Sequence, residues 1–289
     1  MFTSIHIQNF RGIRSGTLSQ LAPLTVLIGP NGCGKSTVLE SIEIAATGDP
    51  HNTFKAINSR RGTDEIRWMH HRDQNEIQWQ LTFSDGKELR RMYRHRSWSP
   101  DPVKGHDATY LGPGVSSSRD ITALYTQAVE RGRREQAQEL VRALLPKAQG
   151  LEILTNAQHQ AILHVVYPWG SIPLSVVGDG VGRVIQMACE LVTSRLTTLV
   201  EEPEIHLHPR AIRLVGELFM EVARRDRQVV ASTHSLELVD AILAAARDER
   251  DLDRVAFYRL GLDDGVLKST RYSGEEARFS RQQIEDDLR

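Results

Sequence analysis

The spacing of hydrophobic residues changes several times along the chain, and each change marks the edge of a predicted element. The apolar run Leu24–Ile28 predicts a short buried strand, which leads into the glycine-rich residues 29–34. Apolar side chains then recur at helical spacing between residues 39 and 46, and Gly48 follows as a helix-ending residue. This part of the chain is therefore predicted to form a strand, a loop and a helix.

The second half repeats this unit. Apolar runs predict strands at residues 196–200, 229–232, 255–260 and 266–270. Helices are predicted at residues 182–193 and over two stretches whose apolar residues share one face, 212–222 and 236–246. Buried strands joined by amphipathic helices predict a mostly parallel sheet with right-handed crossovers.

The middle of the chain follows other patterns. Residues 76–96 alternate apolar and polar positions around Asp85-Gly86 and predict an antiparallel hairpin. Glycine and proline gather in residues 100–114, which predicts loops, and helix-forming residues with an apolar stripe fill 120–145. We therefore expect one domain with two lobes, the first built from residues 1–110 and 183–289 and the second, helical, from residues 111–182.

Composition and charge exclude several classes of protein. The 289 residues include 36 Lys and Arg against 37 Asp and Glu, a net charge of -1, so the chain has no overall field that would attract nucleic acid or a membrane. Two cysteines are too few for a disulfide scaffold and suit a reducing compartment. The start lacks a signal peptide and no 18-residue apolar run occurs. These features predict a cytoplasmic protein without a membrane segment.

The clearest chemical motif lies between the first predicted strand and helix. It fits G-x-x-x-x-G-K-[ST] and reads Gly29-Pro30-Asn31-Gly32-Cys33-Gly34-Lys35-Ser36, with Thr37 next. Glycines let backbone N–H groups approach phosphate oxygens, Lys35 reaches the β- and γ-phosphates, and Ser36 ligates Mg²⁺. The motif predicts a site for a nucleoside triphosphate, with Cys33 as a spacer.

Two later strands carry further candidates at their carboxyl ends. Glu201 follows a buried strand and is predicted to hold Mg²⁺ through water, while Glu202 is predicted to polarise the attacking water as catalytic base. A solvated acidic loop is the alternative for the pair taken alone. His234 ends the next strand, where its imidazole would reach the γ-phosphate or the water.

Together these motifs resemble a known family. With the opening residues 5–12 (IHIQNFRG), they resemble an ABC-type ATPase of the SMC/RecF-like branch, most of all the ATPase domain of OLD-family and phage-defence AAA ATPases. The resemblance rests on LVEEPEIHLHP at residues 199–209 and STHS at 232–235. It implies an α/β P-loop NTPase fold with a nucleotide lobe and a helical lobe, and ATP and Mg²⁺ as cofactors.

The family also implies a signature motif that completes the active site of a second subunit. The candidate is residues 173–180, in which Ser175, Gly178 and Gly180 would meet the γ-phosphate across a homodimer interface. The segment departs from the transporter sequence LSGGQ, and a plain glycine-rich helix cap is the alternative. The family's Q-loop glutamine cannot be assigned, because residues 110–113 contain none.

Three functions compete at this stage. The chain has no long coiled coil, and we expect no Toprim nuclease because it ends soon after the last ATPase strand. We expect an ATPase that senses or regulates a co-encoded effector, a nuclease or toxin, in anti-phage defence. A RecF-like DNA-repair ATPase is the alternative, and a transport ATPase subunit is disfavoured by the signature segment.

Two further patterns remain open. His206 and His208 form an H-x-H that could bind metal, although the resemblance makes this segment the D-loop of the dimer interface. Basic residues on the return strand of the hairpin could contact nucleic acid, or they could protect a solvated edge strand. These basic residues are Arg90, Arg91, Arg94 and Arg96.

Overall fold

The computed structural model of the chain describes residues 1–62, 69–72, 74–94, 97–98, 106, 108–113, 118–194 and 197–281. Strands from both ends of the chain join in one main sheet. They are β1 (Phe2–Phe10), β2 (Ile13–Ser19), β3 (Leu24–Ile28), β4 (Glu76–Phe83), β5 (Glu88–Arg94), β6 (Ser97–Trp98), β7 (Ala108–Leu111), β11 (Thr197–Glu201), β12 (Gln228–Ser232), β13 (Val255–Asp263) and β14 (Val266–Ser273). Within the described residues the sheet is 11-stranded, in the order β6-β5-β4-β1-β2-β14-β13-β3-β12-β11-β7.

The main sheet has a parallel half and an antiparallel half. Strands β13, β3, β12, β11 and β7 are parallel, as predicted for the core of the fold. Every residue of β3, β11 and β12 is buried, because helices cover both faces of these strands. The predicted hairpin is present as β4 and β5, but it belongs to a larger antiparallel half that also contains β1 and β2.

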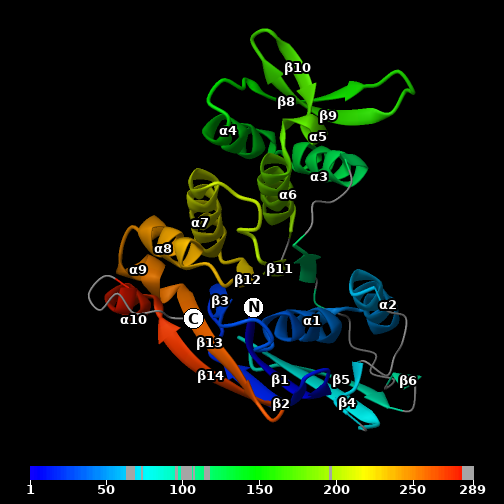
Figure 1. Ribbon diagram of the computed structural model, residues 1–289, viewed down its shortest axis with the longest axis vertical. Helices are drawn as coiled ribbons and strands as arrows, with labels where there is room; N and C mark the ends of the chain where they lie inside the picture. Colours follow the sequence, from blue (N-terminus) through cyan, green and yellow to red (C-terminus); the bar gives the residue numbers. More distant parts are fainter. Residues whose placement is uncertain are drawn as a thin grey trace.

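Helices pack on the two faces of the parallel half. Helix α1 (Lys35–Ala46) covers one face and shares a core with β1, β4 and β5, while α6 (Asp179–Thr193), α7 (Pro209–Arg224) and α8 (Leu236–Ala245) cover the other. Short helices α9 (Glu249–Asp253) and α10 (Gly274–Phe279) flank β13 and β14, and α2 (Pro50–Arg60) follows α1. Figure 1 shows α6, α7 and α8 stacked between the main sheet and the opposite end of the molecule.

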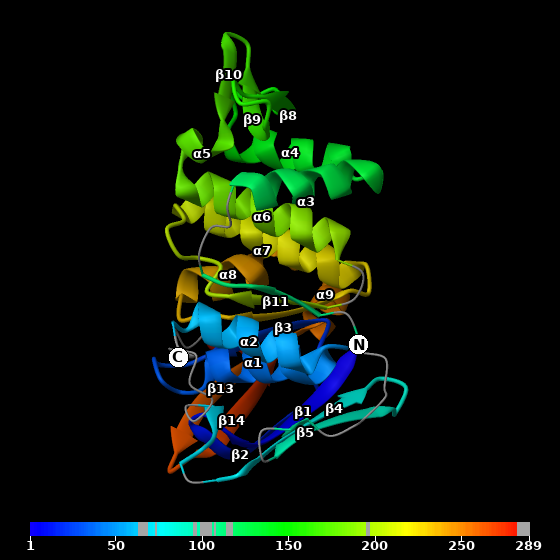
Figure 2. The same cartoon turned by 90° about the vertical axis from the view of Figure 1, so that its right-hand side faces the viewer.

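That opposite end is less purely helical than the sequence predicts. It contains α3 (Ser118–Glu130), α4 (Arg134–Leu144) and α5 (Leu174–Val177), and also a three-stranded antiparallel sheet. The strands of this sheet are β8 (Gly150–Thr155), β9 (Ala161–Tyr167) and β10 (Gly170–Pro173). Leu151, Leu163 and Val165 pack it on α3 and α6, and Figure 2 shows it at the tip of the molecule. The expected helical lobe is therefore corrected to a mixed one.

Candidate functional site

The phosphate-binding loop lies where predicted, between β3 and α1. Gly29, Gly32 and Gly34 have φ values of 140°, 78° and 100°, conformations that favour glycine. A Cβ on Gly29 would lie 2.7 Å from the carbonyl oxygen of Leu260, so the close approach of the loop to β13 also requires glycine. Gly34 is the N-cap residue of α1 and has no side chain to cap it, which leaves the N–H groups of the first helical turn to a bound anion.

Lys35 is buried and bound to its own loop. Its Nζ donates to the carbonyl oxygen of Gly29 at 2.6 Å and to that of Pro30 at 3.0 Å, and it lies 3.9 Å from Cys33 Sγ. Neutral carbonyl oxygens thus hold the ammonium group over the loop. Phosphate oxygens would replace these partners with charged ones, which form stronger hydrogen bonds.

The order of the strands brings the other candidates to the same edge of the sheet. Strand β12 lies between β3 and β11, and all three are parallel. Their carboxyl ends therefore lie side by side, with the phosphate-binding loop after β3, His234 after β12 and Glu202 after β11. The sequence predictions for Lys35, Glu202 and His234 thus converge on one place in the fold.

Glu202 and His234 are close enough to act together. Glu202 Oε1 lies 3.3 Å from His234 Nδ1, and both side chains are partly open to solvent, at 25% and 49% exposed. Glu202 has a φ of 44°, unusual for a residue other than glycine, and its N–H donates to the carbonyl oxygen of Ser232 at 2.9 Å. Non-glycine residues in this conformation gather at functional sites, where the surrounding structure enforces them.

Glu204 orients the histidine, a role that the sequence motif alone did not indicate. Its Oε1 accepts a hydrogen bond from Thr233 Oγ1 at 2.5 Å and another from the backbone N–H of His234 at 3.3 Å. Glu204 is buried, so these bonds fix the turn after β12 in a region with little competing water. The third acid of the EEPE sequence therefore positions His234.

Glu201 is buried among groups that lie far apart in the sequence. Its Oε2 accepts a hydrogen bond from the phenol of Tyr110, and its Oε1 lies 3.4 Å from the guanidinium of Arg61. Arg61 also binds Glu40 at 2.8 Å, and Arg11 lies 3.2 Å from the same carboxylate. Burial raises the pKa of Glu40, while Arg11 and Arg61 oppose this rise. Burial also raises the pKa of Tyr110, so its phenol keeps its proton and donates.

Ser36 and Glu201 fit the predicted magnesium site in chemical type, because Mg²⁺ prefers hydroxyl, carboxylate, phosphate and water oxygens. In the part of the chain that the structure describes, no group of three or more His, Cys, Asp and Glu side chains is arranged to hold a metal ion. A bound Mg²⁺ would therefore depend on phosphate oxygens and water as well as on this chain.

His208 has a structural role, since its Nδ1 accepts the N–H of Arg210 at the start of α7.

The signature candidates lie on the other lobe. Ser175 and Gly178 are exposed, and Gly178 has a φ of 127° at the junction of α5 and α6. A Cβ on Gly180 would lie 2.8 Å from the carbonyl oxygen of His206, so the signature segment packs closely on the expected D-loop of the same chain. This close approach explains a glycine at position 180.

Arg183 connects the start of α6 to the turn that follows β11. From the start of α6, its guanidinium donates to the carbonyl oxygens of Glu201 at 2.9 Å, Glu202 at 2.8 Å and Gly112 at 3.1 Å. It is buried, and these carbonyls belong to residues at or just after the ends of β11 and β7. No sequence motif pointed to Arg183, because its partners are backbone atoms.

The basic residues of the hairpin are divided between the two faces of the sheet. Arg91 is buried and donates to the carbonyl oxygen of Thr47 at 2.8 Å, so it cannot contact a nucleic acid at the surface. Arg90 pairs with Glu88 and Arg94 pairs with Glu76, which offsets their charge. Arg96 lies outside the described residues. Alternation along β5 turns successive arginines to opposite faces of the sheet.

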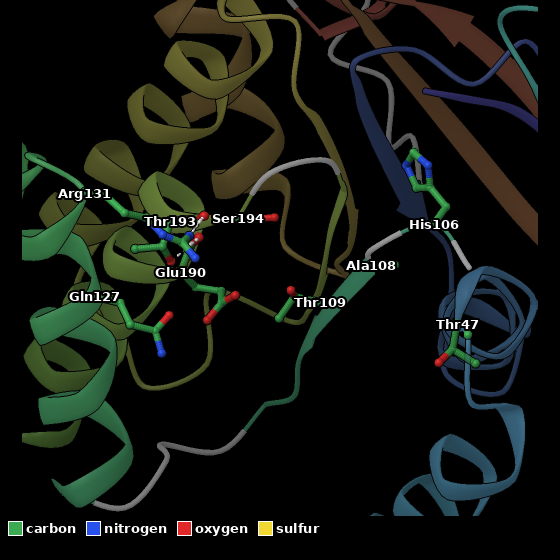
Figure 3. A pocket seen from close by; sticks show the side chains of 10 residues that line it. Thr47, His106, Ala108, Thr109, Gln127, Arg131, Glu190, Thr193 and Ser194 are labelled. Carbon is green, nitrogen blue, oxygen red and sulfur yellow. Dashed lines mark hydrogen bonds between the residues drawn. The ribbon is translucent and has the colours of Figure 1, made fainter. Parts of the chain in front are cut away.

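A separate cavity of about 390 Å³ lies at the far end of α6, between α1, β7 and α3. Figure 3 shows Arg131 beside Thr193, whose carbonyl oxygen it binds, and Glu190 opposite Thr109. Burial raises the pKa of Glu190, and a hydrogen bond from Thr109 opposes this rise. No predicted site residue lines this cavity.

No described helix is long and apolar enough to cross a membrane.

Two family models match successive parts of the chain. The family model "AAA domain" matches residues 4–163, and the model "AAA domain, putative AbiEii toxin, Type IV TA system" matches residues 169–240. The chain is 23% identical over 353 residues to the OLD nuclease of Thermus scotoductus, covering 94% of this chain and 66% of that protein. It is 42% identical over 53 residues to the RecF protein of Acholeplasma laidlawii, covering 18% of this chain and 15% of RecF. The chain thus spans less than two thirds of either relative.

Solved structures show the same fold. The SMC head domain of Pyrococcus furiosus, bound to the C-terminal domain of ScpA, matches with a TM-score of 0.61 at 11% identity and covers 99% of both chains. The SMC head domain of Thermotoga maritima matches with a TM-score of 0.57 at 15% identity, over 94% of this chain and 98% of its own. The family models, the relatives and this fold show that the chain belongs to the AAA domain family, within the SMC/RecF/OLD-like branch of ABC-type ATPases.

Proposed function

We propose that this chain binds and hydrolyses ATP, closes as a homodimer around it, and thereby regulates a partner effector in anti-phage defence. One observation carries the enzymatic part of the proposal. Glu202 and His234 lie 3.3 Å apart on the sheet edge that also presents the phosphate-binding loop. A carboxylate and an imidazole in this position suit activation of a water molecule beside a terminal phosphate.

Binding and catalysis fall to different residues in this proposal. The N–H groups of the loop and the first turn of α1 contact the phosphates, and Lys35 exchanges its carbonyl partners for phosphate oxygens. Mg²⁺, held by Ser36 and through water by Glu201, would offset the charge of the phosphates. Glu202 accepts a proton from the attacking water, while His234, fixed by Glu204, donates a hydrogen bond to the γ-phosphate or orients the water.

The exposed signature segment supports a homodimer with ATP at its interface. Gly178 is open to solvent, and nothing lies within 4 Å of the position of a Cβ. We therefore expect Gly178→Arg to prevent ATP-dependent dimerisation, because bulk and charge would block the contact with a second molecule. Light scattering with ATP, in a Glu202→Gln background that slows hydrolysis, measures this. A φ of 127° strains any side chain at this position, so circular dichroism of the variant is compared with that of the wild type to check that the monomer is folded.

Gly170→Arg provides a matched control. Gly170 is also exposed, has a φ of 149° and has nothing within 4 Å of its Cβ position, but it lies in the turn between β9 and β10. This variant should dimerise like the parent protein. If both variants lose the dimer, or if neither does, Gly178 does not lie at an ATP-dependent interface.

Two observations support the regulatory role: the motifs assigned in the described chain, and the names of the proteins that the chain matches. Every chemical motif of the described chain is assigned to ATP binding and hydrolysis. A shape change driven by ATP has an effect only if another molecule contacts the two states differently. Two matches support a setting in phage defence. One is the family model named for a putative AbiEii toxin, and the other is the Old nuclease of Escherichia phage P2, which is 34% identical over 84 residues.

We expect the purified chain to hydrolyse ATP but to leave plasmid DNA and bulk RNA intact, because no nuclease site is assigned to it. The protein product of a neighbouring nuclease or toxin gene should co-purify with it, and the amount should change with ATP. Gel assays with Mg²⁺ and co-expression pull-downs test these two points. Nucleic-acid cleavage that is lost in Glu201→Gln or Glu204→Gln would refute this division of labour.

A RecF-like role in DNA repair remains the second candidate, because short segments match several RecF proteins at 31% to 42% identity. The paired and buried arginines of the hairpin weaken it, since a repair ATPase must contact DNA. Salt-dependent binding of duplex DNA by the wild-type protein would favour it over the regulatory role.

A further inference from the structure

The carboxylate of Glu201 contacts two partners of different charge, one neutral and one cationic. The phenol of Tyr110 donates to Oε2, and the guanidinium of Arg61 lies 3.4 Å from Oε1. Tyr110 is neutral and leaves the carboxylate its full charge. Arg61 is a cation that would neutralise it, and Arg61 is itself held by Glu40 at 2.8 Å. The position of Glu201 is therefore set by the balance between these two contacts.

Tyr110 reaches Glu201 because of the register of two parallel strands. Strand β7 pairs with β11 so that Tyr110 stands opposite Leu199, two residues before Glu201. Side chains two residues apart on a strand point to the same face, so Tyr110, Leu199 and Glu201 share the face that α1 covers. The phenol thus lies diagonally across from the carboxylate, within reach of a long side chain.

The aromatic ring is held in place from its other side. The guanidinium of Arg60 lies 4.0 Å from the centre of the Tyr110 ring, and Arg60 also pairs with Glu43 on α1. A cation at this distance from a ring is attracted by its π-face and restricts its rotation. The phenol oxygen is therefore fixed relative to α1, the helix that begins at the phosphate-binding loop.

We propose that Tyr110 is the positioning residue for Glu201: its phenol fixes one carboxylate oxygen while Arg61 contacts the other, so that the carboxylate is held where it can take Mg²⁺ together with ATP. This inference rests on the proposed ATP site. The carbonyl oxygen of Gly112, which follows β7, accepts from Arg183, so β7 and the residue after it contact both Glu201 and α6. In the described chain Tyr110 and Arg61 are the side chains that contact the Glu201 carboxylate.

The test removes the phenol oxygen and keeps the ring. Binding of a fluorescent ATP analogue is titrated against Mg²⁺ and is also measured in EDTA, for the wild type and for Tyr110→Phe. We expect Tyr110→Phe to need roughly 3- to 10-fold more Mg²⁺ for half-maximal binding, the loss of one hydrogen bond to a charged group. Binding in EDTA should not change, because Lys35 and the loop are untouched.

Tyr258→Phe is the matched control, since it removes a buried phenol that binds the carbonyl oxygen of Ser19, away from Glu201. It should keep the wild-type Mg²⁺ dependence. An unchanged Mg²⁺ dependence in Tyr110→Phe, an equal change in Tyr258→Phe, or a parallel loss of binding in EDTA would each overturn the positioning role. If the wild type binds no nucleotide at any Mg²⁺ concentration, the proposed ATP site itself fails, a result distinct from these.

Discussion

Lys35→Ala is expected to reduce ATP affinity by about 100-fold or more, because a buried ammonium group is the main cationic partner of the phosphates. The fold should survive, since the partners of Lys35 are carbonyl oxygens and the thiol of its own loop. Isothermal titration calorimetry or binding of a fluorescent nucleotide measures the loss. Phosphate release by Lys35→Ala should then fall to background at ATP concentrations below the millimolar range.

Lys55→Ala is the appropriate control for charge. Lys55 is exposed on α2, the helix that follows α1, and its removal changes the net charge by the same amount. It should bind ATP like the wild type. Equal affinity of Lys35→Ala and the wild type would show that the glycine-rich loop does not hold the phosphates.

Glu202→Gln is expected to keep ATP binding and to lower turnover by roughly 10²- to 10⁴-fold, the usual contribution of a general base. Glutamine preserves the size of the side chain and its approach to His234, but it cannot accept the proton of the attacking water. Single-turnover phosphate release separates the chemical step from binding. With ATP retained, this variant should also accumulate the closed homodimer.

Glu217→Gln, an exposed glutamate on α7, controls for the loss of one negative charge. It should turn over ATP normally. Wild-type turnover in Glu202→Gln would transfer the role of base to Glu201 or Glu204, and the contacts described above make these two weaker candidates. Glu204 is occupied by Thr233, and Glu201 by Tyr110 and Arg61.

Local motifs were enough to predict where the candidate residues lie in the fold. The phosphate-binding loop, Glu202 and His234 each follow a short apolar strand, and parallel strands necessarily bring their carboxyl ends to one edge. The helices at residues 179–193, 209–224 and 236–245 carry clear amphipathic patterns and were predicted to within a few residues. These features depend on interactions between residues that are close in sequence, which a periodic pattern records.

The network around Glu201 could not be predicted in the same way. Tyr110 and Arg61 approach Glu201 across 91 and 140 residues, and only the folded sheet brings them together. Strand β7 spans four residues in a region rich in glycine and proline, and sequence reasoning treated it as loop. Strands β8 to β10 were missed for a similar reason. Their apolar inner face packs on α3 and α6, and the helix-forming composition of the neighbouring residues suggested a purely helical lobe.

Helix α6 has arginine partners at its last turn and an exposed glycine just before its first. Arg131 and Arg227 bind its last carbonyl oxygens, including those of Thr193 and Leu191, whereas Gly178 at its start is exposed. A helix of 15 residues is roughly 22 Å long, so a tilt of about 5° about the bound end would move the other end by about 2 Å. Because Arg183 joins the start of α6 to the backbone of Glu201 and Glu202, we expect a second molecule that presses on Gly178 and tilts the helix to move these two carboxylates as well.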